Sequence, residues 1–335
     1  MSGARLRAAR ASAGLSQSDL ASRAGVSRQL VGAVEAGRHL PRVDSALALA
    51  DALGVSVDWL FGTASVPIDI ASGGTTPDGS MVRVGRVGNQ AVTTPIRIGP
   101  DGWDAADGVV TDGRLTTFGG GSPGIVVGGC EPGLMLMERM LRDGGAGAVS
   151  VSLTSTAALD CLRFGRLHAA VVHGPESNLV ERARDVAVAR FHLARWQVGI
   201  AAAPDAARGW WKPALAGRVP VVQREPGAGV QRAFGQAIPR SRQNVPGPVV
   251  GSHFEAVRLG MAMGIPAVTI EPAARAVGAV FQPIEVHSAE LWIAEVWIGD
   301  EVVESAMSTL MGSRFQRQLA GVGGYDLAGS GVRAG

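Results

Sequence analysis

Residues able to bind a small ligand recur in the second half of the sequence, where a predicted strand gives way to a predicted helix. Five such junctions lie between residues 128 and 255, and a further helix begins near Glu271. A helix N-terminus presents unpaired N–H groups and a partial positive charge, and ligands of open α/β sheets bind beyond the carboxyl ends of the strands. If these junctions point at one cleft, a small polar molecule would be enclosed. The candidate residues are Cys130, Glu131, Thr154, Ser155, Thr156, His173, Gly227, Gly229, Ser252, His253 and Glu271.

Each of these residues also has a purely structural interpretation. The run Thr154–Thr156 is equally typical of helix caps, His173 of a histidine at the end of a strand, and Cys130 of a small buried hydrophobic residue. Glu131 and Glu271 would repel an oxyanion, so they favour a ligand that carries hydrogen-bond donors. The pattern therefore leaves the ligand open between a polar and an anionic molecule.

A thiol enzyme is an alternative because Cys130, His173 and Glu271 supply a nucleophile, a base and an orienting group. No Walker or His-Glu-x-x-His motif is present, however. The six histidines are scattered, with none at the i, i+4 spacing of a helical metal site. We therefore expect no catalytic residues, no metal and no cofactor.

The composition is that of a globular chain with two or three domains. Of its 335 residues, 46% are hydrophobic. The formal net charge is only +2, so any contact with nucleic acid must be local. The N-terminus lacks the apolar core of a signal peptide, and no apolar run reaches roughly 20 residues. With only two cysteines as well, we expect a cytoplasmic protein that makes no contact with a membrane.

Local patterns divide the sequence into four segments. Residues 1–62 are helical with Gly-marked breaks, and residues 63–123 combine a linker with a small β-rich segment that ends in a Gly-rich hinge at 118–124. Residues 124–320 alternate strands and helices, which predicts an α/β domain with largely parallel sheets. Residues 321–335 are expected to form a flexible tail. The predicted strands are 125–128, 148–153, 169–173, 197–202, 219–223, 248–251, 267–270 and 280–286. The predicted helices are 132–142, 156–165, 229–237, 253–262, 272–277 and 301–319.

The first 62 residues contain specific turn chemistry. Ser16 and Ser27 can each cap a helix because a hydroxyl accepts a hydrogen bond from the first turn, and Gly25 suits the tight turn between two helices. The strings LSQ at 15–17, LA at 20–21, AGVSRQ at 24–29 and VEAGR at 34–38 resemble the Cro/phage-repressor (XRE) helix-turn-helix family. The resemblance covers residues 4–62, against the alternative of a generic five-helix packing module. It implies an all-α domain that binds double-stranded DNA.

The resemblance also implies which side chains meet the DNA. In this family the third helix enters the major groove, so Arg28 and Gln29 are the expected base readers and Leu30 is expected to meet a thymine methyl. Glu35 is acidic and is expected to pair with an arginine. One such domain covers little DNA, so a homodimer on a near-palindromic operator is implied. Further contacts to the DNA, mainly to phosphates, are expected from Arg10, Gln17, Ser27, Arg38 and Arg42.

The rest of the chain resembles the periplasmic-binding-protein-like domains that are fused to helix-turn-helix units, above all those related to molybdate-binding proteins. The resemblance covers about residues 124–315 and implies two lobes that close on a ligand. It adds Arg224, from an Arg-x-x-Gly-x-Gly turn, to the candidate ligand-binding residues. The family's acidic residue near the final strand is missing here, so the effector of relatives does not transfer. The resemblance rests on GGCEP at 128–132, TST at 154–156, AAVVHG at 169–174, REPGAGV at 224–230, SHFE at 252–255 and IEPAA at 270–274.

These features together predict a multidomain, sequence-specific transcriptional regulator. Its C-terminal domain would sense a small polar or anionic effector and modulate operator binding. Two alternatives stay open: a C-terminal domain that serves only dimerisation or protein contacts, and a thiol enzyme fused to a DNA-binding domain.

Overall fold

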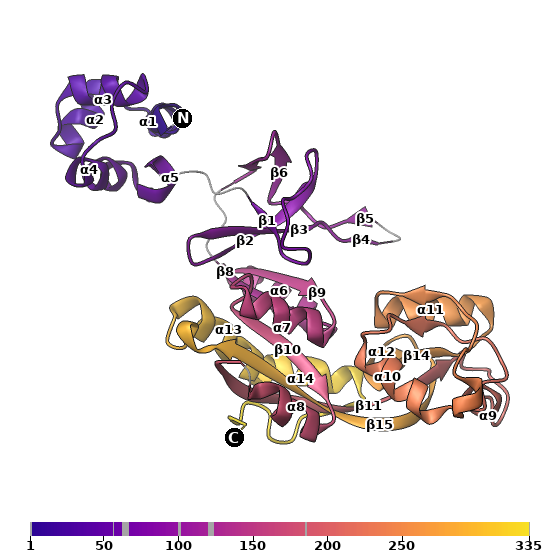
Figure 1. Ribbon diagram of the computed structural model, residues 1–335. Coiled ribbons are helices and arrows are strands. Elements are labelled where there is room, and N and C mark those ends of the chain that lie inside the picture. The colour runs from indigo at the N-terminus through magenta and orange to yellow at the C-terminus, as the bar shows by residue number, and fades with distance from the viewer. Residues whose placement is uncertain are drawn as a thin grey trace. The chain divides into compact units, whose positions relative to one another are not determined.

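The computed structural model describes residues 2–55, 57–61, 67–99, 102–119, 124–184 and 186–334 (Figure 1). The chain forms two compact units, residues 1–65 and 66–335. The predicted Gly-rich hinge at 118–124 falls largely on residues 120–123, which lie outside the described residues. Among the described helices, none is long and apolar enough to cross a lipid bilayer.

The first unit is a bundle of five helices around one apolar core. Ser16 accepts a hydrogen bond from the Asp19 N–H in a capping box, and Ser27 accepts one from the Leu30 N–H, which begins the second and third helices where the sequence predicts. The breaks are closed by Gly25 and Gly54 in the left-handed conformation. The helices are α1 (Ser2–Ser12), α2 (Gln17–Ala24), α3 (Arg28–Glu35), α4 (Val43–Leu53) and α5 (Val57–Phe61). The core consists of Leu6, Leu20, Ala21, Val31, Val34, Leu49, Ala50 and Leu60.

The second unit begins with a β-rich domain that packs on the α/β domain behind it. Five strands form one sheet in the order β1-β3-β2-β6-β7, and a hairpin projects from it. Ile70, Val87 and Val92 share an apolar cluster with Val126 and Leu159 of the α/β domain, so this β-rich segment is held in place by a common core. The strands are β1 (Ile68–Asp69), β2 (Met81–Val87), β3 (Gln90–Pro95), β6 (Gly108–Thr111) and β7 (Arg114–Thr117), with the hairpin β4 (Ile98–Gly99) and β5 (Gly102–Trp103).

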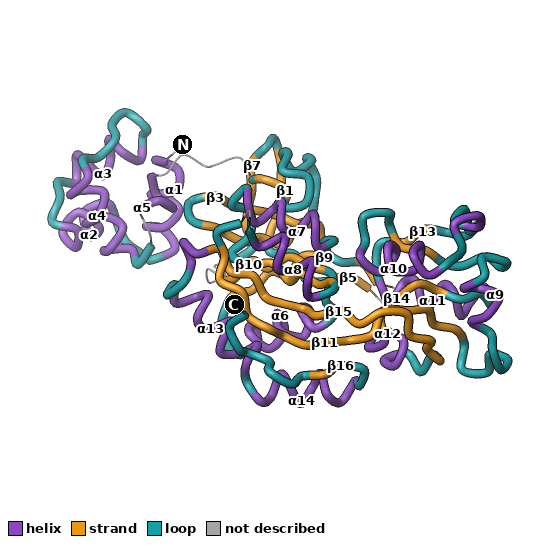
Figure 2. Tube along the Cα trace, turned by 60° about the horizontal axis from the view of Figure 1, so that its bottom comes forward, coloured by secondary structure: helices purple, strands orange, loops and turns teal. Residues whose placement is uncertain are grey.

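The α/β domain has two lobes that share one seven-stranded sheet. The order is β14-β11-β15-β10-β8-β9, and β16 adds to β11. The 15-residue strands β11 and β15 pair over nearly their whole length and run through both lobes (Figures 1 and 2). The strands of the large sheet are β8 (Gly124–Gly129), β9 (Gly147–Ser152), β10 (Ala169–Gly174), β11 (Val188–Ala202), β14 (Ala267–Ile270), β15 (Val280–Ala294) and β16 (Tyr325–Asp326). The short strands β12 (Gln223–Arg224) and β13 (Val249–Val250) pair with each other outside it.

Helices cover both lobes. The first lobe carries α6 (Gly133–Asp143), α7 (Ser155–Arg163), α8 (Glu176–Ala183), α13 (Glu301–Met311) and α14 (Ser313–Val322). The second carries α9 (Trp211–Leu215), α10 (Gly229–Ala237), α11 (His253–Met263) and α12 (Glu271–Ala276). Two short 3₁₀ helices, Arg240–Arg242 and Glu295–Trp297, complete the fold.

The structure corrects three of our expectations for this unit. The large sheet is mixed, because β15 pairs antiparallel with both β10 and β11, and β14 pairs antiparallel with β11. The single helix expected at 301–319 is two helices, since Gly312 is extended with φ −71° and ψ 142°. The strand expected at 219–223 is reduced to the two residues of β12, and α8 and α9 were not predicted.

The prediction of a flexible tail from residue 321 is also wrong. The end of the chain packs along β11, where Tyr325 and Asp326 pair with Trp196 and Arg195. The Ala334 N–H donates to the Arg190 carbonyl at 2.9 Å. These backbone hydrogen bonds fix the segment, which a reading by composition alone does not detect.

Candidate functional site

A cleft of about 1350 Å³ opens between three parts of the second unit. The first lobe contributes the start of α6 and the end of β9, and the second lobe contributes Arg224 and the start of α11. The β-rich domain supplies the third wall. Of the residues expected to bind ligand, five line this cleft: Cys130, Glu131, Arg224, Ser252 and His253.

Arg224 is the most unusual of these because its guanidinium is buried without full hydrogen bonding. Its Nε donates to the Val250 carbonyl at 3.1 Å, and its Nη2 donates to the Gly251 carbonyl at 2.8 Å. Nη1 has no partner among the described residues, although the residue is only 3% exposed. A buried donor of this kind is costly unless it finds an acceptor, so Nη1 is suited to a ligand that brings one.

Glu131 faces the same cleft with one oxygen in use. Its Oε1 accepts hydrogen bonds from the Gly133 N–H at 2.8 Å and from the Tyr325 hydroxyl at 2.6 Å. Its Oε2 has no partner within the described parts of the chain. Burial raises the pKa of Glu131 to about 7, against the effect of the two hydrogen bonds. Near neutral pH this carboxyl is therefore poised between an acceptor and a donor.

Cys130 begins a chain of hydrogen bonds that leads away from the cleft. Its Sγ lies 2.7 Å from His173 Nε2, His173 Nδ1 lies 2.9 Å from His287 Nδ1, and His287 Nε2 lies 3.1 Å from Glu285 Oε2. If Glu285 accepts from His287 Nε2–H, then His287 Nδ1 accepts from His173 Nδ1–H. His173 Nε2 is then the acceptor of the Cys130 thiol proton. One direction of donation thus satisfies every group while both rings stay neutral.

The pKa shifts in this chain agree with neutral partners. Burial raises the pKa of the Cys130 thiol to about 12, and burial, together with the nearby His287 ring and Arg224 guanidinium, lowers the pKa of His173 to about 3. Burial also lowers the pKa of His287, against the pull of Glu285. The Cys130–His173 contact is therefore a hydrogen bond between a thiol and a neutral imidazole, and it is not a thiolate–imidazolium pair.

The remaining expected ligand residues support the cleft or lie away from it. Ser155 Oγ accepts a hydrogen bond from the His173 N–H at 3.1 Å, and a Cβ on Gly229 would stand 3.3 Å from the His173 ring. Both residues thus position His173. Four others do not line the cleft. Thr154 caps α7, Thr156 is exposed, Gly227 has open space around it, and Glu271 pairs with Arg275 at 2.6 Å.

Sequence reasoning missed His287 and Glu285, and it missed the third wall. His287 and Glu285 alternate on β15, so they lie on one face of a strand. That signal was available, but the predicted strand stopped at 286 and its partners were unknown.

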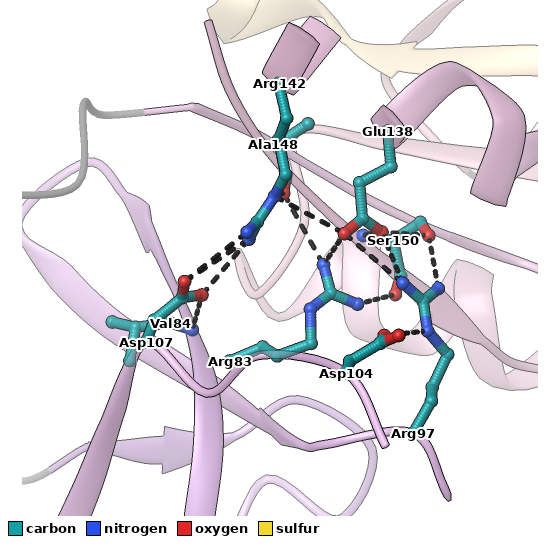
Figure 3. Close-up of polar contacts among 9 residues, drawn as sticks. All are labelled: Arg83, Val84, Arg97, Asp104, Asp107, Glu138, Arg142, Ala148 and Ser150. Atoms are coloured by element: carbon teal, nitrogen blue, oxygen red, sulfur yellow. Dashed lines mark hydrogen bonds and ion pairs between the residues drawn. The ribbon is translucent and has the colours of Figure 1, made fainter. Parts of the chain in front are cut away.

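The third wall is held by a buried cluster of charges (Figure 3). Glu138 of α6 accepts hydrogen bonds from Arg83 of β2 and from Arg97, whose Nη2 lies 3.2 Å from Oε2. Ser150 of β9 donates to the same carboxylate through its hydroxyl at 2.6 Å and its N–H at 3.0 Å. Arg97 Nε also donates to Asp104 Oδ2 at 2.6 Å. The cluster therefore joins the β-rich domain to α6 and β9, beside the cleft.

A second ion pair extends this contact. Arg142 of α6 lies 3.2 Å from Asp107, and Asp107 also accepts a hydrogen bond from the Val84 N–H at 3.0 Å. Arg142 Nε donates to the Ala148 carbonyl at 3.1 Å. The β-rich domain is thereby fixed to the first lobe at two adjoining points.

The residues that the sequence predicts at the DNA belong to the first unit. Ser27, Arg28 and Gln29 are exposed at the start of α3, and Arg38 and Arg42 are exposed beyond its end. This arrangement leaves the N-terminal turn of α3 free to approach a groove.

The other residues expected at the DNA, Arg10, Gln17 and Leu30, make contacts inside the protein. Arg10 donates to Glu35 at 2.6 Å and to the Leu15 carbonyl at 2.7 Å, and Gln17 donates to Glu35 at 2.9 Å. Burial opposes the charge of Glu35, but these hydrogen bonds hold its pKa below the usual value. Glu35 thus pairs with an arginine, as predicted. Leu30 is half-buried against the core.

Comparison with protein families identifies both units. Residues 6–60 match the helix-turn-helix family, of the XRE type, and residues 138–311 match the family described as the PBP superfamily domain. The chain belongs to the PBP superfamily. Its α/β domain resembles periplasmic binding proteins, as the sequence predicted. The matched PBP domain starts at Glu138, so the β-rich wall and Cys130 lie outside it.

Solved structures similar to each unit are known. The restriction-modification controller protein C.AhdI from Aeromonas hydrophila is 42% identical over 18% of this chain and 91% of its own, with a TM-score of 0.18. A phosphate ABC transporter substrate-binding protein from Clostridium perfringens, solved with phosphate, is 9% identical over 61% of this chain and 99% of its own, with a TM-score of 0.49. No curated protein matches the chain.

Proposed function

We propose that this PBP-superfamily protein is a transcriptional regulator that binds an operator through its helix-turn-helix domain and a small molecule in its cleft. Occupancy of the cleft would modulate operator binding. The observation that carries the proposal is buried Arg224, which lines a cleft in a domain joined to a DNA-binding unit and whose Nη1 has no partner among the described residues. The effector is a small polar or anionic molecule, because Arg224 supplies a donor and Glu131 an adjustable acceptor.

Operator recognition is assigned to the exposed start of α3. Arg28 can bond bidentately to guanine and Gln29 to adenine, while Arg38 and Arg42 are free to contact phosphates. Arg10 and Gln17 are bound to Glu35 and are better suited to orienting α1 and α2 against α3. The regulator is proposed to act as a homodimer on a near-palindromic site.

The test is a thermal-shift screen of the full chain against a panel of metabolites and oxyanions. A ligand that binds only the folded state raises the unfolding temperature. At a free concentration of a hundred times its Kd, it adds about 2.7 kcal/mol to the free energy of unfolding. A compound that stabilises the wild type but not Arg224→Gln supports the assignment. A panel that stabilises neither variant, together with a cleft filled by side chains in a crystal, would favour a domain used only for dimerisation or protein contacts.

Thiol catalysis is the second candidate because Cys130 and His173 are in contact. A nucleophilic thiol needs a thiolate or a nearby base that can generate one. The raised pKa of Cys130 and the lowered pKa of His173 oppose both conditions, so binding is favoured over catalysis. Turnover of any panel compound that is abolished by Cys130→Ala would reverse this ranking.

A further inference from the structure

The β-rich domain does more than abut the PBP domain, because two of its arginines line the cleft. Arg83, Arg97 and Asp104 are among the cleft-lining residues, and all three lie outside the matched PBP domain. We propose that Arg97 is a ligand-binding residue and that the effector is an organic anion whose acidic group takes the place of Asp104 on Arg97. The inference rests on the proposed function, since it names the class of ligand for the same cleft.

Exposure and position at the cleft together separate Arg97 from the other two arginines of the cluster, which is drawn in Figure 3. The Arg83 side chain is 1% exposed and donates hydrogen bonds to Glu138 and to the Ser150 carbonyl. Arg142 is exposed, but it does not line the cleft. The Arg97 side chain is 34% exposed and lines the cleft while it remains anchored to Glu138. A ligand can therefore reach its guanidinium without breaking the buried part of the cluster.

The balance of charge in the cluster favours an exchange of partners. Three arginines face three carboxylates: Arg83, Arg97 and Arg142 against Asp104, Asp107 and Glu138. Asp104 is 38% exposed, and among the described residues its ion pair is with Arg97 alone, through Nε, so water can readily solvate its carboxylate on release. Once Asp104 leaves, the cluster carries one excess positive charge, which an anion compensates.

The cleft has room for an organic molecule. Ligand pockets usually measure about 300–1,000 Å³, and this cleft is larger at about 1350 Å³. A bare tetrahedral oxyanion would leave most of that space unfilled. The unsatisfied Nη1 of Arg224, on the opposite lobe, supplies a second donor for such a ligand.

The experiment measures anion binding by the full chain in two variants that should change it in opposite directions. Succinate, citrate, glycerol 3-phosphate and inorganic phosphate are titrated at constant ionic strength by calorimetry. Loss of a charged hydrogen bond should weaken an organic anion roughly ten- to a hundredfold in Arg97→Gln. Asp104→Asn should tighten it, because the competing carboxylate is gone. Arg86→Gln is the matched control, since Arg86 lies on β2 as Arg83 does but is exposed and outside the cleft lining.

The outcomes separate this inference from the proposed function. Opposite shifts in Arg97→Gln and Asp104→Asn, with Arg86→Gln unchanged, support it. Equal weakening in both variants would mean that the wall is only structural and would overturn it. If Arg224→Gln loses binding while Arg97→Gln and Asp104→Asn match the wild type, the cleft is a sensor but Arg97 is not part of it. A wild type that binds none of the organic probes, or inorganic phosphate alone, overturns the ligand class, and the metabolite panel then decides the function.

Discussion

Both units bury a charged side chain, but they complete its hydrogen bonds differently. In the helix-turn-helix unit, Glu35 receives hydrogen bonds from Arg10 and Gln17, and both of its oxygens are used. In the α/β domain, Arg224 and Glu131 each keep one buried polar atom without a partner among the described residues. Buried polar groups are nearly always satisfied in folded proteins. The difference supports the proposal that Glu35 holds structure, whereas Arg224 and Glu131 bind a ligand.

The largest expected effect is on the satisfied side of this comparison. Glu35→Ala leaves Arg10 and Gln17 without their shared acceptor, and breaking a buried ion pair costs about 3–5 kcal/mol. Arg10 is itself partly exposed, so we expect the lower end of that range. Differential scanning calorimetry of the full chain should show a lower transition for the helical unit, and an unchanged thermogram would contradict the structural role of Glu35.

The next effect is a pH dependence of stability that originates at Glu131. Its pKa rises from 4.5 to about 7 on folding, so the folded state holds a proton that the unfolded state has lost between these values. Stability from this group is full below about pH 4.5 and is lost as the pH rises through 7, by at most about 3 kcal/mol. Urea unfolding of the wild type and of Glu131→Gln across this range should show that the difference between their free energies of unfolding shrinks as the pH falls. A difference that stays constant with pH would contradict the raised pKa of Glu131.

An intermediate effect concerns DNA and tests the assignment of α3. Gln29→Ala should weaken binding to the specific operator by about 1–3 kcal/mol and relax the choice of one base. Arg38→Ala should instead weaken binding to all sequences and flatten the dependence on salt. Fluorescence anisotropy with operator and scrambled duplexes distinguishes the two variants, and an unchanged footprint for Gln29→Ala would mean that another element reads the bases.

The smallest expected effect is on stability when Arg224, with its unpaired buried Nη1, is replaced. Arg224→Met removes a buried guanidinium whose ion pair, at 3.3 Å, is with the partly exposed carboxylate of Glu225, so water can solvate the carboxylate that remains. Replacing buried charged groups with apolar side chains is often close to neutral. We expect the free energy of unfolding without ligand to change by less than about 1 kcal/mol. A loss as large as that of Glu35→Ala would place Arg224 among the structural residues and remove the contrast between the units.

The helical unit was predictable from its sequence because its signals are local. The caps at Ser16 and Ser27 and the turn at Gly25 depend on residues within one helical turn, and the structure confirms them. The pairing of Glu35 with an arginine was also confirmed, although its partner Arg10 had been expected at the DNA.

The candidate cleft was predictable only in part because its contacts are non-local. Cys130 and His173 were chosen as residues at strand ends, and the structure brings them together. Nothing near residue 287 indicates that β15 passes beside β10, so His287 and Glu285 were missed. The mixed sheet was missed for a local reason as well. Charged residues such as Arg190 and Arg195 interrupt the apolar pattern of β11. The wall of Arg83 and Arg97 depends on packing between domains, which no local pattern reveals.

The position of β15 has a consequence for how the protein is made. This strand lies between β10 and β11 in the sheet, although it follows both of them by many residues in the chain. During synthesis, neither lobe can complete its sheet until residues 280–294 have left the ribosome. The edges of β10 and β11 stay unpaired until then, and unpaired edges favour aggregation. We expect the two lobes to become stable together, late in translation and in one cooperative step.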